Sequence, residues 1–505
     1  MAMLATLGQL LAGYAPISAA SAAQPITGLA IDSRAIRPGE VFFALSGEKH
    51  HGLKFFDAVQ VAGAAAVVWE PPCDEAIIPT KQEIPLVAMA QLRQKLGPIS
   101  ARYWGEPSQH LQVVGITGTD GKTSCAHFIA QALSASNSGS CGILGTLGIG
   151  AYGQVQPSVH TTPDPLTIQS WLAGLCADDQ RFAVMEVSSH ALEQGRVNGV
   201  EFAVAVLTNL TRDHLDYHGS LDAYAAAKRR LFFEHQPHWQ ILNLDDAFGR
   251  QLIADLQPST RVVGYGFGAR PEAVRHFVGG ESLTLTPAGL RLWVRSSWGA
   301  GELQVGLLGR FNAHNILATL ATLLVLDMPF AEAMARVAQT ATVPGRMERL
   351  GGIDGQPLAV VDYAHTPYAL EQVLSTLQEH GGQRLWCVFG CGGDRDPGKR
   401  PLMGAVAERL AAQVIITDDN PRTEDPDRIV SGILAGMHNP GAALVIRDRR
   451  TAIERALADA GADDIVLVAG KGHEDYQIIG TERLPFSDRM IVGRCLGFDH
   501  QDEAA

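Results

Sequence analysis

The pattern of hydrophobic and polar positions divides the middle of the chain into short apolar runs separated by longer mixed segments. A mainly apolar run covers 111–116, and later runs cover 182–187, 202–207 and 239–243. Short continuous runs of this kind, alternating with segments of helical length, are typical of buried parallel strands. The pattern therefore predicts an α/β protein with a parallel sheet that is covered by helices.

Similar runs precede this central region. Three of them predict the strands of a small mixed α/β domain over residues 1–88; they lie at 26–34, 39–45 and 62–69. The segment 71–85 contains prolines and polar residues, which indicates the approach to a linker. We place the central domain at 89–345.

The C-terminal part repeats the alternation of strands and helices. Its strands are predicted at 358–361, 385–389, 413–416 and 464–469. We therefore expect a Rossmann-like, doubly wound domain over 346–505, with ligand groups at the C-terminal ends of the strands. Residues 260–310 show a period of two, which predicts an added antiparallel patch, and a helix is expected over 312–326.

A glycine-rich turn follows the first central strand and carries the strongest chemical signal. It reads Gly118-Thr-Asp-Gly-Lys-Thr-Ser124, and a helix is expected over 124–133. Glycines let the backbone N–H groups of such a turn point at phosphate oxygens, and the helix N-terminus adds partial positive charge there. Lys122 would reach the terminal phosphates, and the Thr123 hydroxyl would bind Mg²⁺. The alternative is a structural glycine turn before a helix.

Composition narrows the classes of function. The chain has 505 residues and a net charge of −13, and no basic stripe occurs, which argues against nucleic acid as a general partner. The cysteines are scattered and odd in number (seven), which favours a reduced, cytosolic chain. We expect no membrane span, because no apolar run is long enough, and no signal peptide, because the Ala-rich residues 1–23 lack a basic leader.

The spelling of the turn departs from the common phosphate-binding loop, which has a glycine at the place of Ile116. It resembles the Gly-Thr-Asn-Gly-Lys-Thr motif of the Mur ligases, the ATP-dependent amino-acid ligases of peptidoglycan precursor synthesis. Asp120 replaces the Asn of that motif. The resemblance extends from Asp32 to Glu474 and implies that the following residues bind ATP: Gly118, Thr119, Asp120, Gly121, Lys122, Thr123, Ser124, Asn315, Arg346 and Asp362.

Two stretches near the ends of central strands are candidates for a metal site. A carboxylate at the end of a strand, such as Glu186, can reach Mg²⁺ bound to Thr123. The string 208–218 resembles the metal element of the Mur ligases, which implies that His214 is a Mg²⁺ ligand; a core histidine is the alternative. By the same resemblance Lys228 adds CO₂ and becomes a carbamate ligand, whereas spacing alone favours a surface lysine. The implied catalytic residues are Lys122, Glu186, His214 and Lys228.

Further stretches match family positions that hold the UDP-linked substrate. Ile31-Asp-Ser-Arg34 resembles an element of the first domain that binds the UDP part, although a capped turn is the alternative for Ser33 and Arg34. His160 stands where related ligases often carry Asn. The resemblance implies contacts to this substrate from Ile31, Ser33, Glu48, Lys49, His50, Thr161, Thr162, Ser188, Gln194 and Arg196.

Three polar loops follow strands of the third domain and would converge on one crevice: 390–395, 418–422 and 470–474. Their arginines, acids and amide suit an amino acid with a second zwitterionic end. The string Asp-Asn-Pro-Arg422 also matches the diaminopimelate-adding Mur ligases, whereas lysine-adding relatives lack this Arg; the alternative is an Asn-Pro turn with a surface arginine. The candidate diaminopimelate contacts are Arg395, Asp419, Asn420, Pro421, Arg422, Gly470 and Glu474.

The resemblance implies a ligase that uses ATP and Mg²⁺ to join meso-diaminopimelate to the D-Glu of UDP-N-acetylmuramoyl-L-Ala-D-Glu, through an acyl phosphate. We expect a cytoplasmic monomer without a nucleic-acid partner. Two classes of alternative stay open. One is another ligase of the superfamily, either lysine-adding or a folylpolyglutamate synthetase. The other is a nucleotide-dependent switch, which would hold or hydrolyse ATP without consuming an amino acid.

Overall fold

The structure is a computed structural model that describes residues 6–47, 50–134, 141–211, 213–257, 259–268, 272, 274–286, 288–353, 355–381 and 384–498. The chain forms two compact units. One comprises residues 1–278 and 318–329, and the other comprises 279–317 and 330–505. The division into three domains at residues 88 and 345 stays a prediction.

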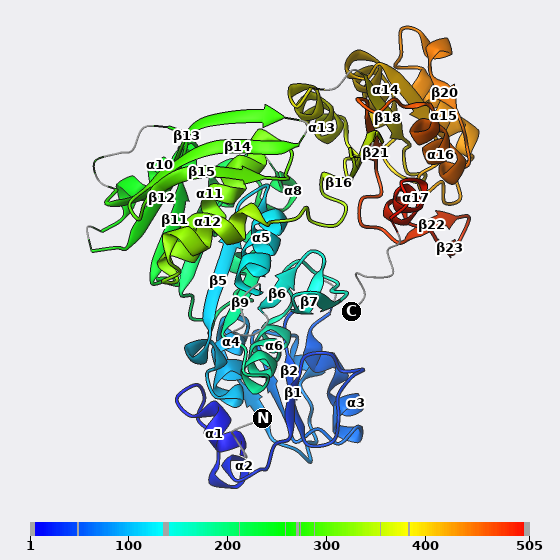
Figure 1. The fold of residues 1–505 in the computed structure, drawn as a ribbon. Helices are drawn as coiled ribbons and strands as arrows, with labels where there is room; N and C mark the ends of the chain where they lie inside the picture. Colours follow the sequence, from blue (N-terminus) through cyan, green and yellow to red (C-terminus); the bar gives the residue numbers. More distant parts are fainter. Residues whose placement is uncertain are drawn as a thin grey trace. The chain divides into compact units, whose positions relative to one another are not determined.

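The first part of unit one contains a sheet of four parallel strands in the order β1-β2-β3-β4. Figure 1 labels the first two of them. The strands are β1 (Gly28–Ala30), β2 (Glu40–Ala44), β3 (Ala66–Trp69) and β4 (Leu86–Ala88). Two apolar clusters pack around them, one including residues of α1 (Leu7–Leu11) and α4 (Leu92–Trp104), the other residues of α3 (Phe56–Val61). The three strands predicted here are confirmed. The short β4 was not predicted, because three residues carry too little pattern.

The central sheet of unit one places β5 (Gln112–Thr117) between β10 (Val204–Leu207) and β9 (Phe182–Glu186), and all three are parallel. Beyond them lie β11 (Trp239–Asn243) and β12 (Val262–Gly266) on one side, and β6 (Gly142–Gly145), β7 (Gly148–Ala151) and β8 (Gln154–Gln156) on the other. The four predicted central strands are therefore confirmed. β12 lies at the start of the predicted antiparallel patch, but it pairs in parallel with β11. The prediction was wrong for this strand.

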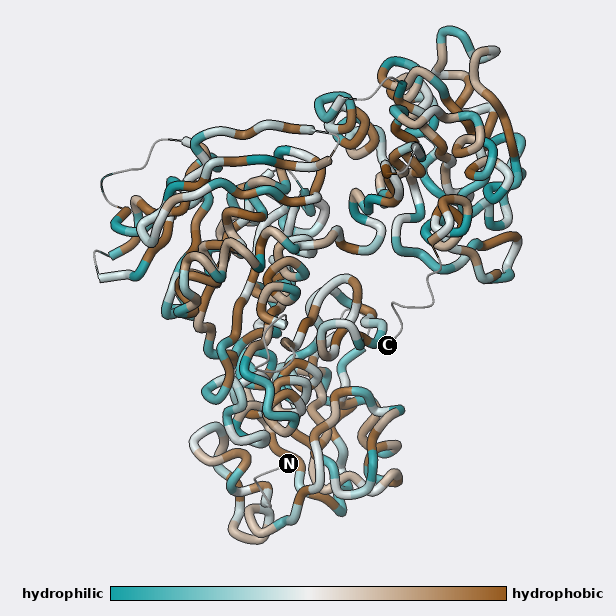
Figure 2. Tube along the Cα trace, viewed as in Figure 1, coloured by the Kyte–Doolittle hydropathy of each residue, from teal (hydrophilic) through white to brown (hydrophobic). Residues whose placement is uncertain are grey.

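Helices connect these strands, as the alternating pattern predicts. The helix after the glycine turn is α5 (Lys122–Ser134), which contacts β9. The others are α6 (Pro165–Ala177), α7 (Ser189–Glu193), α8 (Leu215–His218), α9 (Leu221–Phe233) and α10 (Ala247–Asp255). Figure 2 shows that hydrophobic residues follow the strands, while hydrophilic ones gather in loops. The core on one face of this sheet joins apolar side chains of β5, β9 and β10 to those of α6, α9 and α10.

Unit two begins within β13 (His276–Thr286), which is followed by β14 (Gly289–Ser296) and β15 (Ala300–Val305). β14 and β15 pair antiparallel, which confirms this part of the predicted patch. The predicted helix at 312–326 is α11 (Arg310–Val325), and α12 (Phe330–Ala338) follows it.

A second sheet in unit two has the order β16-β17-β21-β18-β19-β20. Its strands are β16 (Glu348–Gly351), β17 (Leu358–Asp362), β18 (Leu385–Phe389), β19 (Gln413–Ile416), β20 (Leu444–Val445) and β21 (Ile465–Ala469). Only β16 is antiparallel to its neighbour among the pairings of this sheet in the described chain. The four predicted strands are confirmed.

Helices cover both faces of this second sheet. One core includes residues of α13 (Pro367–Glu379), α14 (Lys399–Leu410) and α15 (Pro426–Leu434). The opposite core includes residues of α16 (Arg449–Asp459) and α17 (Asp488–Cys495). This arrangement confirms the doubly wound prediction. A two-stranded ribbon, β22 (Tyr476–Ile479) and β23 (Glu482–Pro485), follows β21. No helix in the described part of the chain is long and apolar enough to cross a membrane.

Candidate active site

The glycine turn lies at the C-terminal end of β5 and is held by the loop after β10. Gly118 has a φ of +152°, and a Cβ atom added there would lie 1.8 Å from Thr208 Oγ1, so only glycine fits. Thr208 Oγ1 donates to the Asp120 carbonyl at 2.6 Å, and Asn209 Oδ1 accepts from the Asp120 N–H at 2.9 Å. The Asp120 backbone therefore fixes the turn, while its side chain is exposed.

The lysine of the turn is directed at the backbone of the turn itself. Lys122 Nζ donates to the carbonyls of Gly118 and Thr119, at 2.9 and 2.7 Å. In a complex, a phosphate oxygen would accept from the Lys122 N–H groups that these two carbonyls now occupy. Lys122 opens α5, so its charge lies beside the partial positive charge of that helix N-terminus.

A carboxylate and two hydroxyl groups form an oxygen-rich cluster next to the turn. Glu186 ends β9 and is 1% exposed. Its Oε2 accepts from Thr123 Oγ1 at 2.9 Å, and its Oε1 accepts from the Thr146 N–H at 2.7 Å. Burial raises the pKa of Glu186, and the nearby Lys122 charge and these hydrogen bonds act in the opposite direction. Oxygen donors of this kind suit Mg²⁺, and the predicted proximity of Glu186 and Thr123 is confirmed.

Lys228 lies inside the protein, which rules out the alternative of a surface lysine. It projects from α9, is 1% exposed, and donates from Nζ to the Gly118 carbonyl at 2.6 Å. The Tyr224 ring centroid is 4.4 Å from Nζ, and the Tyr224 hydroxyl donates to Thr119 Oγ1 at 3.3 Å. Burial lowers the pKa of Lys228 well below its usual value, and Lys122 adds to this effect, whereas Asp213 and Asp120 oppose it. The environment therefore favours a neutral amine.

His214 is exposed, so it is not the core histidine of the alternative interpretation. Its Nε2 lies 3.4 Å from Asp213 Oδ2, and its ring centroid lies 5.1 Å from that of His190. The His218 side chain is buried instead, with its ring nitrogens 2.9 Å from Ser189 Oγ and 3.1 Å from Glu193 Oε2. Among the described residues, no group of three or more His, Cys, Asp and Glu is arranged to hold a metal ion. A role of His214 at Mg²⁺ stays a prediction.

The predicted contacts to the peptide part of the substrate form one hydrogen-bonded chain. Arg196 donates from Nε and Nη2 to Gln194 Oε1, at 3.0 and 2.7 Å, and from Nη1 to the Thr162 carbonyl at 2.7 Å. Thr162 Oγ1 donates to the Glu186 carbonyl at 2.8 Å and accepts from the Ser188 N–H. Thr162 therefore ties this chain to the end of β9. Thr161 lies nearby, with its hydroxyl 3.3 Å from that of Thr146.

The remaining predicted substrate contacts lie near the first sheet of unit one. Ile31 and Ser33 are half-buried after β1, and Ile31 packs on the core of that part. Asp32 caps the turn by accepting from the Arg34 backbone and guanidinium, and Arg34 holds the pKa of Asp32 at about 2. His50 is exposed. The predicted contacts Glu48 and Lys49 lie outside the described residues.

Three predicted nucleotide contacts belong to unit two. Asn315 is buried on α11 and donates from Nδ2 to Asn312 Oδ1 at 3.0 Å. Asp362 ends β17 and accepts from the N–H groups of Met347 and Ala364, at 2.7 and 2.8 Å, so both of its oxygens fix the backbone. The Arg346 guanidinium lies 5.0 Å from the Tyr363 ring centroid. Their contact with a nucleotide stays a prediction.

The three polar loops of unit two converge as predicted. Asn420, from the loop after β19, donates to Glu474 Oε2 at 3.1 Å, and Glu474 lies in the loop after β21. Arg422 donates from Nη1 to the Gly393 carbonyl at 2.8 Å, which links the loop after β19 to that after β18. Asp419 is buried, and burial raises its pKa.

The other candidates in these loops differ in exposure. Pro421 is buried beside Arg422, which is half-buried and has a φ of +53°. Gly470 has a φ of +120°, a conformation that favours glycine. Arg395 is exposed.

Three site residues escaped the sequence analysis. Thr146 directly follows β6, so the rule that found Glu186, a polar residue at the C-terminal end of a parallel strand, would have found it too. Tyr224 is four residues before Lys228 on α9, one turn away. Lys471 lies between two glycines after β21, and it is fully buried among predicted ligand contacts.

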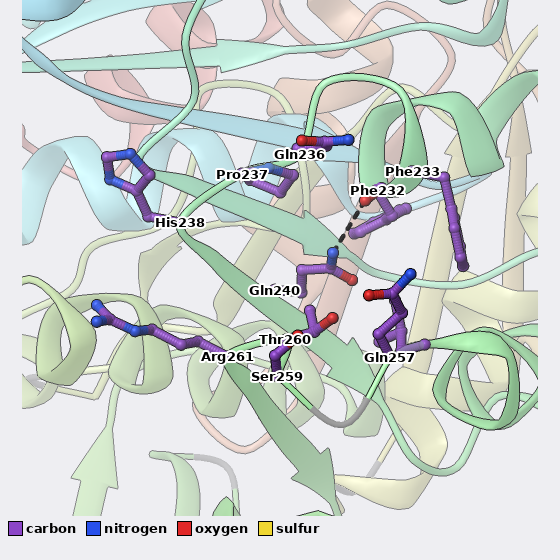
Figure 3. Close-up of a pocket in the computed structure, with 11 residues that line it drawn as sticks. Phe232, Phe233, Gln236, Pro237, His238, Gln240, Gln257, Ser259, Thr260 and Arg261 are labelled. Atoms are coloured by element: carbon purple, nitrogen blue, oxygen red, sulfur yellow. Dashed lines mark hydrogen bonds between the residues drawn. The ribbon is translucent and has the colours of Figure 1, made fainter.

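A separate cavity of about 610 Å³ lies where β11 and β12 begin, away from the strand ends that carry the turn (Figure 3). Gln240 lines it and donates from Nε2 to the Phe232 carbonyl at 2.9 Å. His238 and Arg261 lie on another side of the cavity in this view. None of the residues predicted from the sequence lines this cavity among the described part of the chain.

Comparison with known proteins places the chain in a family. The Mur ligase middle domain matches residues 116–323, the Mur ligase glutamate ligase domain matches 345–472, and the Mur ligase family catalytic domain matches 25–100.

Two curated proteins and one solved structure are similar along nearly the whole chain. The UDP-N-acetylmuramoyl-L-alanyl-D-glutamate–2,6-diaminopimelate ligase of Alkalilimnicola ehrlichii is 50% identical, over 94% of this chain and 95% of the relative. The ligase of the same name from Chromobacterium violaceum is 48% identical, over 94% of each chain. A solved structure of such a ligase has a TM-score of 0.76 at 36% identity, over 98% of this chain and 99% of that one. The chain belongs to the Mur ligase family.

Proposed function

We propose that this chain is an ATP-dependent ligase that joins meso-diaminopimelate to the D-Glu carboxylate of UDP-N-acetylmuramoyl-L-Ala-D-Glu. The observation that carries the proposal is the converged site in unit two, where Asp419, Asn420, Arg422 and Glu474 lie together. Relatives at 48–50% identity over almost the whole chain carry the name of this activity. We further propose that the protein acts as a monomer in the cytoplasm.

The glycine turn of unit one suits the phosphates of ATP. Lys122 and the N-terminus of α5 supply positive charge, and the Gly118 conformation opens the backbone to the ligand. When phosphate binds, Lys122 Nζ exchanges its backbone acceptors for phosphate oxygens. This exchange places its charge where negative charge develops during phosphoryl transfer.

The cluster of Thr123, Thr146 and Glu186 fits Mg²⁺ because it offers a buried carboxylate and hydroxyl oxygens within hydrogen-bond distance of one another. Mg²⁺ bound there would neutralise negative charge on phosphate oxygens.

Lys228 fits the role of a carbamate because its surroundings favour the neutral amine. The neutral amine attacks CO₂, an N–C bond forms, one proton is lost, and the neutral side chain becomes an anionic carbamate. The product would add carboxylate oxygens near the turn, where Lys228 now contacts Gly118. The carbamate and His214 would complete the proposed metal ligands.

The proposed reaction has two steps. A carboxylate oxygen of D-Glu attacks the γ-phosphorus of ATP, the bond to ADP breaks, and an acyl phosphate forms. The neutral amine of diaminopimelate then attacks the acyl carbon, phosphate leaves, and the amine loses its proton. Arg196 suits a substrate carboxylate, because its guanidinium is half-buried and oriented by Gln194.

Phosphate release tests this proposal. We expect release only when ATP–Mg²⁺, the UDP-linked dipeptide and meso-diaminopimelate are all present. Equal release without an amino acid would support the nucleotide switch. Release with L-lysine or with a folate and glutamate, but not with diaminopimelate, would assign the chain to another ligase of the superfamily.

A further inference from the structure

Lys471 lies among the proposed amino-acid contacts without reaching solvent. It is 0% exposed, between Gly470 and Gly472, whose φ values of +120° and +53° bring the backbone of this loop into place. An ammonium group inside a protein is unfavourable unless acceptors surround it. The neighbours of Lys471 must therefore satisfy its N–H donors.

Those neighbours are three of the proposed ligand contacts. Lys471 Nζ donates to Glu474 Oε2 at 3.0 Å and to Asn420 Oδ1 at 3.1 Å. It also lies 3.6 Å from Asp419 Oδ1. Its charge thereby joins the loop after β19 to the loop after β21. The Tyr476 ring centroid, 5.5 Å away, covers another side of the ammonium group.

These contacts fix the orientation of the Asn420 amide. Asn420 Oδ1 accepts both from Lys471 Nζ and from the Ile478 N–H, the latter at 2.9 Å. The amide nitrogen must then face the other way, where it donates to Glu474 Oε2. Without the ammonium group, the amide loses one of the two donors that hold its oxygen in place.

Among Arg449, Asp488, Lys471, Asp419 and Glu474, the carboxylates outnumber the cations by one. Arg449 and Asp488 form a fully buried ion pair at 2.7 Å, and both influence Asp419. The Lys471 ammonium balances one of the two remaining carboxylates, Asp419 and Glu474. A buried excess of negative charge favours a cationic group, such as the ammonium of an amino acid.

We propose that Lys471 is a positioning residue for the incoming amino acid. It orients the Asn420 amide and the Glu474 carboxylate, and it sets the charge of the site to match one ligand ammonium. This inference rests on the proposed function. Lys471 acts through its neighbours, because its full burial keeps it from the ligand.

The variant Lys471→Met removes the charge and keeps an unbranched side chain. We expect the KM for diaminopimelate to rise about 10-fold to 100-fold, with the KM for ATP within about twofold of the parent. Arg384→Met is the matched control, because Arg384 pairs with Asp464 at 2.8 Å, at the opposite end of β21. This control should lower Tm and leave both KM values unchanged. A normal KM for diaminopimelate in folded Lys471→Met would overturn the proposal.

A double variant keeps the test valid if Lys471→Met does not fold. Lys471→Met with Glu474→Gln removes one positive and one negative charge, which restores the charge balance. If Lys471 acts through Glu474, Lys471→Met raises the KM for diaminopimelate less in the Glu474→Gln background than in the parent. If the single variant is unfolded, we expect the KM of the double variant to exceed that of Glu474→Gln by less than about 10-fold. A full 10-fold to 100-fold increase in that background, or no increase in either, contradicts the proposal. The parent enzyme's requirement for diaminopimelate tests the function separately.

Discussion

The phosphate-binding turn of unit one and the amino-acid loops of unit two both lie at the C-terminal ends of parallel strands, but they handle charge differently. In the turn, Lys122 and Lys228 both donate to the Gly118 carbonyl. In the loops, Lys471 is matched by the carboxylates of Asp419 and Glu474. The Lys122 ammonium, held by carbonyl dipoles, suits an anionic ligand, whereas the Lys471 ammonium, already matched by carboxylates, suits a zwitterion. The C-terminal ends of parallel strands thus suit an anionic ligand in one unit and a zwitterion in the other.

The largest expected effect concerns the turn. Lys228→Ala should lower turnover at least about 10³-fold, because the buried amine and its carbamate are lost. The fold should be retained, since alanine is favourable in α9 and a buried amine is removed. Phosphate release and Tm measure the two effects.

Arg229→Ala is the matched control for Lys228, because Arg229 is the next residue and pairs with Asp255 at 2.5 Å. It should stay active. Intact-mass measurement of the parent should show the added carboxylate on Lys228. A fully active Lys228→Ala variant would remove this residue from the site.

The second effect concerns the far end of the amino acid. Diaminopimelate carries one carboxylate more than lysine, and the Arg422 guanidinium is the proposed fork for it. With lysine bound, this half-buried group would lack its partner, at a cost of about 2–4 kcal/mol. Arg422→Ala should therefore raise the KM for diaminopimelate roughly 30-fold to 1000-fold and leave the KM for ATP nearly unchanged.

The exposed Arg428 on α15 offers a control for Arg422. Arg428→Ala should not change the KM for diaminopimelate. Arg422→Lys should restore little, because an ammonium group cannot form the two parallel hydrogen bonds. A near-normal KM in Arg422→Ala would move the recognition of the far carboxylate to Arg395 or another group.

A smaller effect is expected where the loop after β10 holds the turn. Thr208→Val removes the 2.6 Å hydrogen bond to the Asp120 carbonyl. This hydrogen bond stabilises the turn by about 1 kcal/mol, so its loss should raise the KM for ATP about fivefold. Thr117→Val is the control, because the buried Thr117 hydroxyl has no hydrogen-bond partner among the described residues. Equal KM values in the two variants would argue against this role of Thr208.

The smallest effect concerns the acidic residue of the turn. Asp120→Asn keeps the backbone contacts and removes a charge that raises the pKa of Lys228. The pKa of Lys228 should fall further, so the neutral amine persists to lower pH. Turnover at neutral pH should change less than about threefold, and the acid limb of the pH–rate profile should move to lower pH. A shift to higher pH would contradict this electrostatic effect.

The sequence predicted the strands that are buried on both faces, because such strands are continuous apolar runs. β5, β9 and β21 are examples, with four or five buried positions each. It did not predict β4, whose three residues leave no pattern. Nor did it predict that β12 pairs in parallel with β11, because the direction of a strand depends on the segment that connects it to its neighbour.

Site residues were predictable from the sequence where their position at a strand end defines their role. They were less predictable where the burial of a charged side chain depends on contacts made by the fold. Gly118 and Glu186 follow from their places at strand ends. The burial of Lys228 does not follow from its spacing, because the Gly118 carbonyl and the Tyr224 ring that cover it come from the fold. Lys471 was missed for the same reason: its partners on the loop after β19 lie about 50 positions away in sequence.

The most direct test of the account is a competition between two amino acids. The protein is incubated with ATP–Mg²⁺, the UDP-linked dipeptide and equal amounts of meso-diaminopimelate and L-lysine, and the product is identified by mass. The account predicts a product that carries diaminopimelate, in at least about 30-fold excess over the lysine product. Comparable amounts of both products, or ADP formation without any adduct, would contradict it.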